Sequence, residues 1–196
     1  RNDAPTTTPR PFDVDRDGLV VGEGAATLIL EEREHARARG VPILAEIVGY
    51  ATSCDGFELM RPDPAGMQRV MELALSGAGL RPADIGYVNA HATATAIGDA
   101  AESRATSNVF GAATPVSSLK GFMGHTLGAC GALEAWMTIQ MMREGWFAPT
   151  LNLDRVDPAC QGLDHIQHEP RELHVDRVVS NNFAFGGVNT SLIFGR

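Results

Sequence analysis

Residues 117–131 read SSLKGFMGHTLGACG, and this stretch decides the architecture around it. Lys120 and His125 stand between a short β-forming run and a segment, 128–143, whose first turns are rich in glycine and alanine. The later positions of that segment are mostly large and apolar, so a helix formed there has almost no polar face. Small residues let backbones approach closely, at a helix-propensity cost of about 1 kcal/mol per glycine. We therefore predict that 128–143 is a helix buried nearly all round between two sheets.

Outward from this stretch, β-forming and helix-forming segments alternate. Residues 64–78 have Met67, Val70, Met71 and Ala74 at the spacing of one helix face. A short apolar run at 25–30 is suited to a buried strand. The other expected strands are 43–51, 85–89, 116–118, 178–180 and 191–194, and the other expected helices are 31–39 and 100–110. Such alternation predicts an α/β fold.

Composition excludes several classes of function. The formal net charge is −8 and the sequence pI is about 5.2, so we expect no nucleic-acid partner and no anionic membrane surface. No apolar run approaches the roughly 20 residues that cross a bilayer, so no membrane association is expected. Three cysteines without regular spacing favour a reducing cytoplasmic location over a disulfide scaffold.

Three polar segments follow predicted strands, which is where α/β proteins tend to place their sites. The segment 89–95 reads NAHATAT, 117–128 contains Lys120 and His125, and 180–189 reads SNNFAFGGVN. Taken singly, each has an ordinary structural explanation. A strand-end histidine is often structural, a lone lysine is usually on the surface, and FAFGG could be a hairpin turn with core aromatics.

Together the three segments resemble the β-ketoacyl-acyl carrier protein synthases of the thiolase superfamily. That family shows His-Gly-Thr-x-Thr, then Lys followed by Gly-His-x-x-Gly-Ala-x-Gly, then Asn-x-Phe-Gly-Phe-Gly-Gly-x-Asn. RPFDVDRDG at 10–18 and GEGA at 22–25 also resemble family segments, so the resemblance covers nearly the whole chain. Two glycines of the pattern are replaced, by Ala92 and Ala184, and each change adds only a methyl group.

The resemblance implies a thiolase-like layered αβαβα fold. Residues 1–40 would be the end of its N-terminal half, and 41–196 its C-terminal half. Because the chain begins at Arg1 in a loop-like polar stretch, we expect it to be part of a longer polypeptide. We also expect one sheet face and the helix at 128–143 to lack partners here, which would expose a large apolar surface.

The resemblance also implies an activity, decarboxylative Claisen condensation of malonyl-acyl carrier protein with a cysteine-bound acyl thioester. His91 and His125 would stabilise the enolate through Nε–H donors. The dipole of the helix after His125 would lower the pKa of that imidazole. Lys120 would order the site electrostatically while paired with Glu134 or Glu102.

Other roles follow from the same resemblance. Thr93 and Thr95 would hydrogen-bond the pantetheine arm. Phe185 would offer its backbone N–H to the thioester oxyanion, and its ring would gate the acyl pocket together with Phe183. No cofactor is expected beyond the phosphopantetheine of acyl carrier protein, which would be a partner, and the enzyme would be a homodimer or a ketosynthase heterodimer.

None of the three cysteines suits the nucleophile. Cys54 lies in a segment that is non-nucleophilic in the family, Cys130 should be packing inside the helix, and Cys160 follows Asp157-Pro158 in a loop. We expect the catalytic cysteine in a missing N-terminal portion of the same enzyme. No metal is expected, because the i, i+3 histidines His165 and His168 lack accompanying ligands. Ser180, Asn181 and Glu134 could hold a structural monovalent cation.

Two alternatives remain beside an active elongating synthase. A chain-length-factor-like subunit would pair with an active synthase without catalysing; such subunits usually lose a member of the His/Lys set, which is complete here. A degradative thiolase would carry a second cysteine near the C-terminus, where this chain has FAFGG. Fatty-acid, polyketide and polyene pathways use the same chemistry and are not separated by the sequence.

Overall fold

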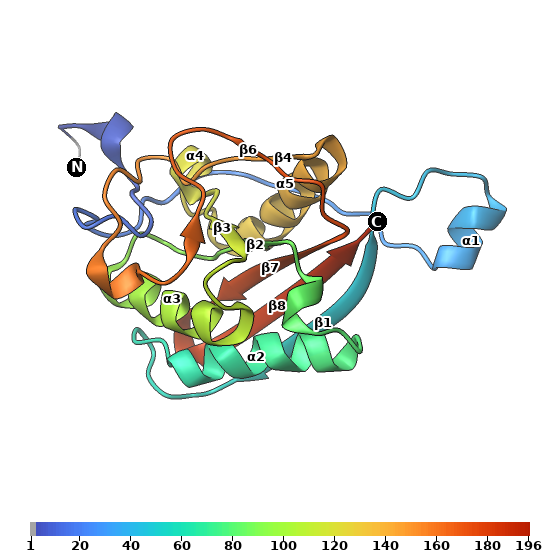
Figure 1. Ribbon diagram of the computed structural model, residues 1–196, viewed down its shortest axis with the longest axis horizontal. Helices are drawn as coiled ribbons and strands as arrows, with labels where there is room; N and C mark the ends of the chain where they lie inside the picture. The colour runs from blue at the N-terminus through green and yellow to red at the C-terminus, as the bar shows by residue number, and fades with distance from the viewer. Residues whose placement is uncertain (1–2) are drawn as a thin grey trace.

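A computed structural model describes residues 3–196 as a six-stranded sheet with helices on both faces (Figure 1). The helices are α1 (Arg33–Ala38), α2 (Pro64–Gly77), α3 (Ala96–Phe110), α4 (Lys120–Met123) and α5 (Cys130–Glu144). The strands are β1 (Glu46–Cys54), β2 (Tyr87–Asn89), β3 (Pro115–Ser117), β4 (Trp146–Phe147), β5 (Asp164–His165), β6 (Arg171–Glu172), β7 (Arg177–Phe183) and β8 (Val188–Gly195). Short 3-10 turns lie at Pro5–Thr7, Pro82–Asp84, Leu127–Ala129, Pro158–Cys160 and Phe185–Gly187.

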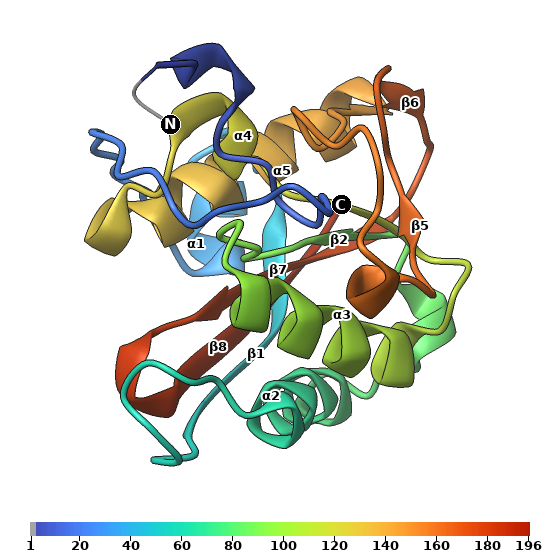
Figure 2. The ribbon, with the colours of Figure 1, turned by 90° about the vertical axis from the view of Figure 1, so that its left-hand side faces the viewer.

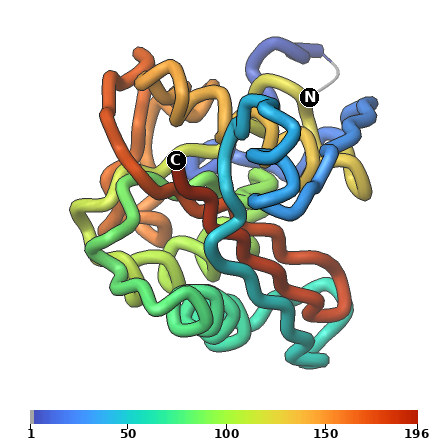
Figure 3. The backbone as a smooth tube through the Cα atoms, turned by 90° about the vertical axis from the view of Figure 1, so that its right-hand side faces the viewer, coloured from blue at the N-terminus to red at the C-terminus, as the bar shows by residue number. Residues whose placement is uncertain are grey.

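The sheet has the strand order β1-β8-β7-β2-β3-β5, and β4 and β6 form a separate pair. Strands β1, β8 and β7 are antiparallel neighbours that run side by side (Figure 3). By contrast, β2 is parallel to both β7 and β3, and β3 is parallel to β5. The carboxyl ends of β7, β2 and β3 therefore meet at one edge of the sheet.

Two apolar cores lie on the two faces of this sheet. Because side chains alternate along a strand, Val88 and Val179 face the core under α2 and α3. Tyr87 and Val178 face the other core, which lies under α5. Figure 2 shows β2 and β7 passing between these helical layers. The predicted α/β architecture is confirmed.

Helix α2 forms where its sequence pattern predicts. The Asp63 carboxylate accepts hydrogen bonds from the N–H groups of Ala65 and Gly66, which caps the helix. The four predicted core positions of this helix are all buried. Helix α3 begins at Ala96, four residues earlier than predicted. No helix among residues 3–196 is long and apolar enough to cross a membrane.

The predicted buried strand at 25–30 is wrong. These residues form no strand and all are exposed, including Ile29 at 85% and Leu30 at 72%. The segment leads into α1, which projects from the rest of the chain (Figure 1). A strand needs a neighbouring ladder for its backbone groups, and within residues 3–196 no strand pairs with this segment.

The prediction that the helix after His125 is buried all round is also wrong for these residues. One face of α5 is buried and includes Glu134, Ala135 and Thr138, whereas Trp136 is 48% exposed. The six-stranded sheet covers α5 from one side, where β7 lies beneath it, and the short pair of β4 and β6 contacts it through β4. Among the described residues no second large sheet covers the face on which Trp136 is exposed.

Candidate active site

The sheet edge formed by β7, β2 and β3 carries the predicted site residues. His91 lies two residues after β2, Lys120 three residues after β3, and Phe183 is the last residue of β7. These strands are parallel neighbours, so their carboxyl ends bring together three segments that are far apart in the sequence.

The two histidines lie side by side. The ring centroids of His91 and His125 are 5.2 Å apart, with the rings nearly perpendicular at 86°. The ring of Phe183 stands edge-on to His91, with centroids 6.2 Å apart. Both imidazoles can therefore reach one small group between them.

A parallel bridge between Val21 and His125 holds the second histidine in place. The N–H of His125 donates to the carbonyl of Val20 at 2.7 Å, and the N–H of Gly22 donates to the carbonyl of His125 at 3.0 Å. A Cβ at Gly22 would lie 2.0 Å from the carbonyl oxygen of Met123. The family-like segment at 22–25 thus has a physical reason to begin with glycine.

The backbone after His125 determines which of its nitrogens carries the proton. Leu127 donates its N–H to Nδ1 at 3.2 Å, so Nδ1 is the acceptor and Nε2 carries the hydrogen. The pKa of His125 is lowered to about 4, first by burial and then by the charge of Lys120. This is the predicted direction, and burial and the Lys120 charge are its causes here. A 3-10 turn at Leu127–Ala129 leads from His125 into α5, which begins at Cys130.

His91 is anchored through its backbone by Glu102. The N–H groups of His91 and Ala92 donate to the two carboxylate oxygens of Glu102 at 2.8 and 2.7 Å. Burial raises the pKa of Glu102 to about 8, against the effect of these two donors. Burial and then the Lys120 charge hold the pKa of His91 well below its ordinary value. Glu102 therefore supports the histidine and is not the ionic partner of Lys120.

Glu134 is the partner of Lys120. The lysine ammonium donates to Oε1 of Glu134, and both side chains are almost fully buried. Asn182 donates its amide to Oε2 of the same carboxylate at 3.0 Å. A buried pair of this kind is costly to break, because either partner alone would be an uncompensated charge.

A cavity of about 570 Å³ opens beside the histidines. Its walls include His91, His125, Thr93, Thr95, Phe183 and Phe185, together with the apolar side chains of Leu19, Leu59, Met60, Pro62 and Met67. The hydroxyls of Thr93 and Thr95 are 3.1 Å apart. Phe183 is 7% exposed and Phe185 is 56% exposed. Lys120 does not line the cavity. Its charge nevertheless lowers the pKa of both histidines.

Several supporting residues were not found from the sequence. Arg16 bonds the carbonyl groups of Thr95 and Ala96 and approaches the buried Asp99 at 3.7 Å. It thereby ties the segment 10–18 to the threonine loop. Burial raises the pKa of Asp99 to about 6. The only sequence signal for this arrangement was the charge pattern of residues 10–18.

The other polar residues that the sequence offers as possible ligands make contacts within the protein. His165 packs on Phe12 with ring centroids 4.7 Å apart, and its Nε2 lies 2.9 Å from the carbonyl oxygen of Cys160. Ser180 Oγ accepts from Asn89 at 3.1 Å. Asn181 donates its amide to the sulfur of Met71 at 3.2 Å.

This geometry defines a class of site: two neutral imidazoles at an apolar cavity, suited to donating hydrogen bonds to a developing oxyanion. Residues 44–154 match the family model "Beta-ketoacyl synthase, C-terminal domain". The chain belongs to the β-ketoacyl synthase family.

Individual proteins of known sequence or structure are similar to this chain. The chain is 46% identical to 3-oxoacyl-(acyl-carrier-protein) synthase 2 of Mycobacterium tuberculosis over 100% of this chain and 47% of the relative. It superimposes on a β-ketoacyl synthase from Burkholderia phymatum with a TM-score of 0.99 and 62% identity, covering 100% of this chain and 48% of that one. The structure of a type II polyketide acyl-carrier protein in complex with its ketosynthase superimposes with a TM-score of 0.89 and 31% identity. The match covers 97% of this chain and 48% of that one. The chain thus has the predicted thiolase-like fold and spans about half the length of these proteins.

Proposed function

We propose that this chain provides the enolate-stabilising part of a β-ketoacyl synthase, an acyltransferase. The reaction would be decarboxylative Claisen condensation of malonyl-acyl carrier protein with an acyl thioester, in fatty-acid, polyketide or polyene elongation. The observation that carries the proposal is the pair of imidazoles with centroids 5.2 Å apart, both with lowered pKa, beside the cavity.

In the proposed reaction, the malonyl thioester breaks its C–C bond to the carboxylate and releases CO₂. The bonding electrons pass into the thioester as an enolate, whose oxygen accepts hydrogen bonds from His91 and His125. The enolate carbon then attacks the acyl carbonyl held on a cysteine, and the cysteine leaves as thiolate. Neutral histidines suit this work because each keeps its donor without adding a fixed charge. Each such donor is typically worth about 3–4 kcal/mol.

The remaining cavity residues fit binding roles. Thr93 and Thr95 place two hydroxyls on the cavity wall, suited to the amides of a phosphopantetheine arm. Phe185 precedes Gly186, whose N–H donates to the carbonyl of Leu59 at 2.9 Å, so the loop is braced where the Phe185 N–H would face the thioester oxyanion. The exposed Phe185 ring and the buried Phe183 ring would gate the acyl pocket.

Partners belong to the same proposal. Acyl carrier protein would deliver the substrates; a related ketosynthase is known in complex with its acyl-carrier protein. The nucleophilic cysteine would come from a part of the enzyme outside these 196 residues, and the enzyme would be a homodimer or a ketosynthase heterodimer in the cytoplasm. We place the boundary between the two halves of the thiolase-like fold at residue 40, because all strands of the six-stranded sheet lie after that residue.

The test uses the complete polypeptide that contains this chain. We expect His91→Ala and His125→Ala each to slow release of labelled CO₂ from malonyl-acyl carrier protein by about 10²–10³-fold. Acyl transfer onto the cysteine, detected by mass spectrometry, should persist at least partly. His174→Ala is the matched control, because His174 is exposed on the surface, and it should leave both steps unchanged.

Two outcomes would contradict the proposal. Release of CO₂ by the His125→Ala enzyme at the wild-type rate would make His125 structural. A complete polypeptide that takes up no acyl group and releases no CO₂, yet restores activity to a separate synthase, would instead be a chain-length-factor-like subunit.

A further inference from the structure

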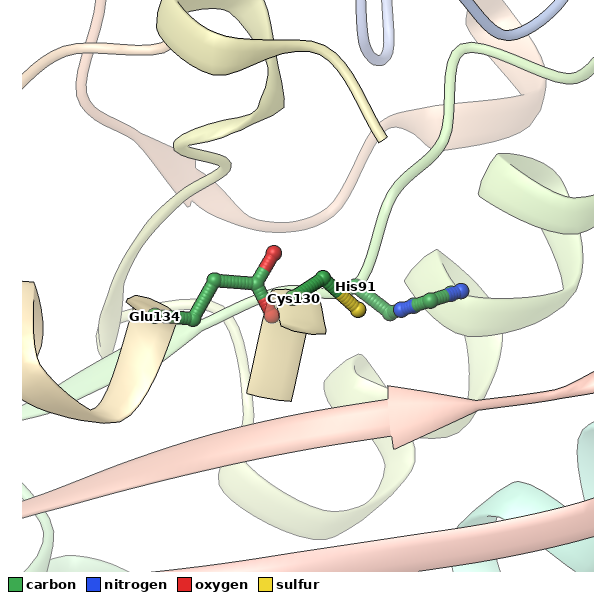
Figure 4. Close-up of side chains that lie close together, drawn as sticks. All are labelled: His91, Cys130 and Glu134. Atoms are coloured by element: carbon green, nitrogen blue, oxygen red, sulfur yellow. The ribbon is translucent and has the colours of Figure 1, made fainter. Parts of the chain in front are cut away.

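Three buried side chains with metal-binding atoms meet at the wall of the cavity. One ring nitrogen of His91, the sulfur of Cys130 and a carboxylate oxygen of Glu134 all lie within 4.8 Å of one another. Cys130 and Glu134 are one helical turn apart on α5, so they share a face of that helix. Figure 4 shows the sulfur between the carboxylate and the imidazole. Among residues 3–196 this is the one such group.

The proposed condensation does not use all of these atoms. The Cys130 thiol has no part in it and donates only to Oδ1 of Asn182, at 3.2 Å. His91 is 9% exposed, and its buried Nδ1 has no hydrogen-bond partner in the structure. Burying a ring nitrogen without a hydrogen-bond partner costs folding free energy. Nδ1 of His91 is therefore free to coordinate a metal ion.

The chemistry of the three atoms selects a soft divalent cation. Thiolate, imidazole and carboxylate are the ligands that Zn²⁺ takes in proteins, at about 2.0–2.3 Å. Tetrahedral ligands at those lengths lie roughly 3.5 Å from one another, so closure needs atomic shifts of about 1 Å or less. His91 and Cys130 also line the cavity, which leaves a fourth position open to water.

We propose that His91, Cys130 and Glu134 form a site for a soft divalent cation such as Zn²⁺, and that its occupation switches the condensing site off. Binding releases the Cys130 proton to solvent, and the thiolate offsets one of the two positive charges of the cation. Because the Glu134 carboxylate is already paired with Lys120, the site gains one positive charge in total. Glu134 keeps Oε1 on Lys120 while Oε2 exchanges the Asn182 amide for the metal. A cation there holds His91 rigidly and places a fixed positive charge where a neutral donor is needed. Because Lys120 stays nearby, binding is weaker than at a structural zinc site.

The test measures metal binding, so its outcome is independent of whether the proposed condensation is correct. Co²⁺ is titrated into the complete polypeptide, and the thiolate-to-cobalt charge-transfer absorption is recorded; Zn²⁺ affinity follows from competition. The wild type should bind one Co²⁺ per chain with this absorption. Cys130→Ala should lose it and weaken Zn²⁺ binding by at least about 100-fold, since losing even an outer-shell partner costs about 10–100-fold.

Two further variants make the result decisive. Cys54→Ala removes an exposed cysteine outside the cluster and should behave as the wild type. Cys130→Ser keeps the shape of the side chain and should lose the absorption while unfolding at the same denaturant concentration as the wild type. Zn²⁺ should slow CO₂ release in the wild type and not in Cys130→Ala. A wild type without the absorption, or a Cys130→Ala protein that keeps it because another thiol binds the metal, would overturn the proposal.

Discussion

At His125, two neighbours decide the state of one imidazole. The Leu127 N–H occupies Nδ1, which leaves the hydrogen on Nε2, and burial together with Lys120 lowers the pKa. His91 reaches the same neutral state by deeper burial. The local sequence thus supplies the histidines, and their surroundings keep both uncharged at neutral pH.

The lowered pKa of His125, about 4 against 6.5, predicts a pH effect on stability. As the pH falls from about 6.5 towards 4, His125 becomes protonated in the unfolded chain but stays neutral in the folded chain. The contribution of His125 to the free energy of unfolding therefore falls. We expect His125→Ala to lose less stability than the wild type between about pH 6.5 and pH 4.5. Urea unfolding of the complete polypeptide measures this, with His174→Ala as control; parallel stability curves for His125→Ala and wild type would contradict it.

Phe185→Ala should act on a different step. The change keeps the backbone N–H and removes only the half-exposed ring. We expect altered chain-length preference and altered rates of acyl loading, with decarboxylation little changed. Mass spectrometry of the acyl-enzyme over a series of acyl donors checks this. An equal loss in CO₂ release and in loading would show that the ring supports the histidines instead.

Among the elements, α5 places Glu134 against Lys120 at the start of α4. Glu134→Gln would leave the buried ammonium uncompensated, and we expect a loss of about 3–5 kcal/mol in the free energy of unfolding. Glu144→Gln, at the exposed end of the same helix, should change the free energy of unfolding by no more than about 0.5 kcal/mol. Similar losses of unfolding free energy in the two variants would show that the buried Lys120–Glu134 pair does not stabilise the fold more than a surface charge does.

The elements also show why some predictions succeed. Helix α2 was predictable because its cap and its apolar spacing are local, and the helix closes its own hydrogen bonds. The apolar run at 25–30 has strand-like composition, but a strand depends on partners that no local pattern reveals. Likewise, apolar residues all round α5 show that the helix is suited to burial, while neighbouring layers decide how much of it is covered.

Across the whole molecule, the uncovered apolar groups predict how the 196-residue chain behaves alone. Ile29, Leu30, Tyr50 and Trp136 are all exposed, more than an isolated domain usually tolerates. We expect the isolated chain to aggregate or to bind a dye that reports apolar surface, whereas the complete polypeptide should do neither. Light scattering and dye fluorescence measure this. A monomeric chain of these 196 residues that unfolds cooperatively would contradict it.

The sequence by itself determined the family and the α/β class, and it identified the histidines, the lysine and the phenylalanines as candidate site residues, because all of these depend on residue type and order. Only the tertiary structure decided that Glu134 rather than Glu102 pairs with Lys120, and that Glu102 holds the backbone of His91. It also brought Cys130 against His91 and Glu134. The physical reason is that these contacts join segments that are far apart in the sequence and are brought together by the parallel strands of the sheet. Spacing along the chain does not specify which of these side chains meet.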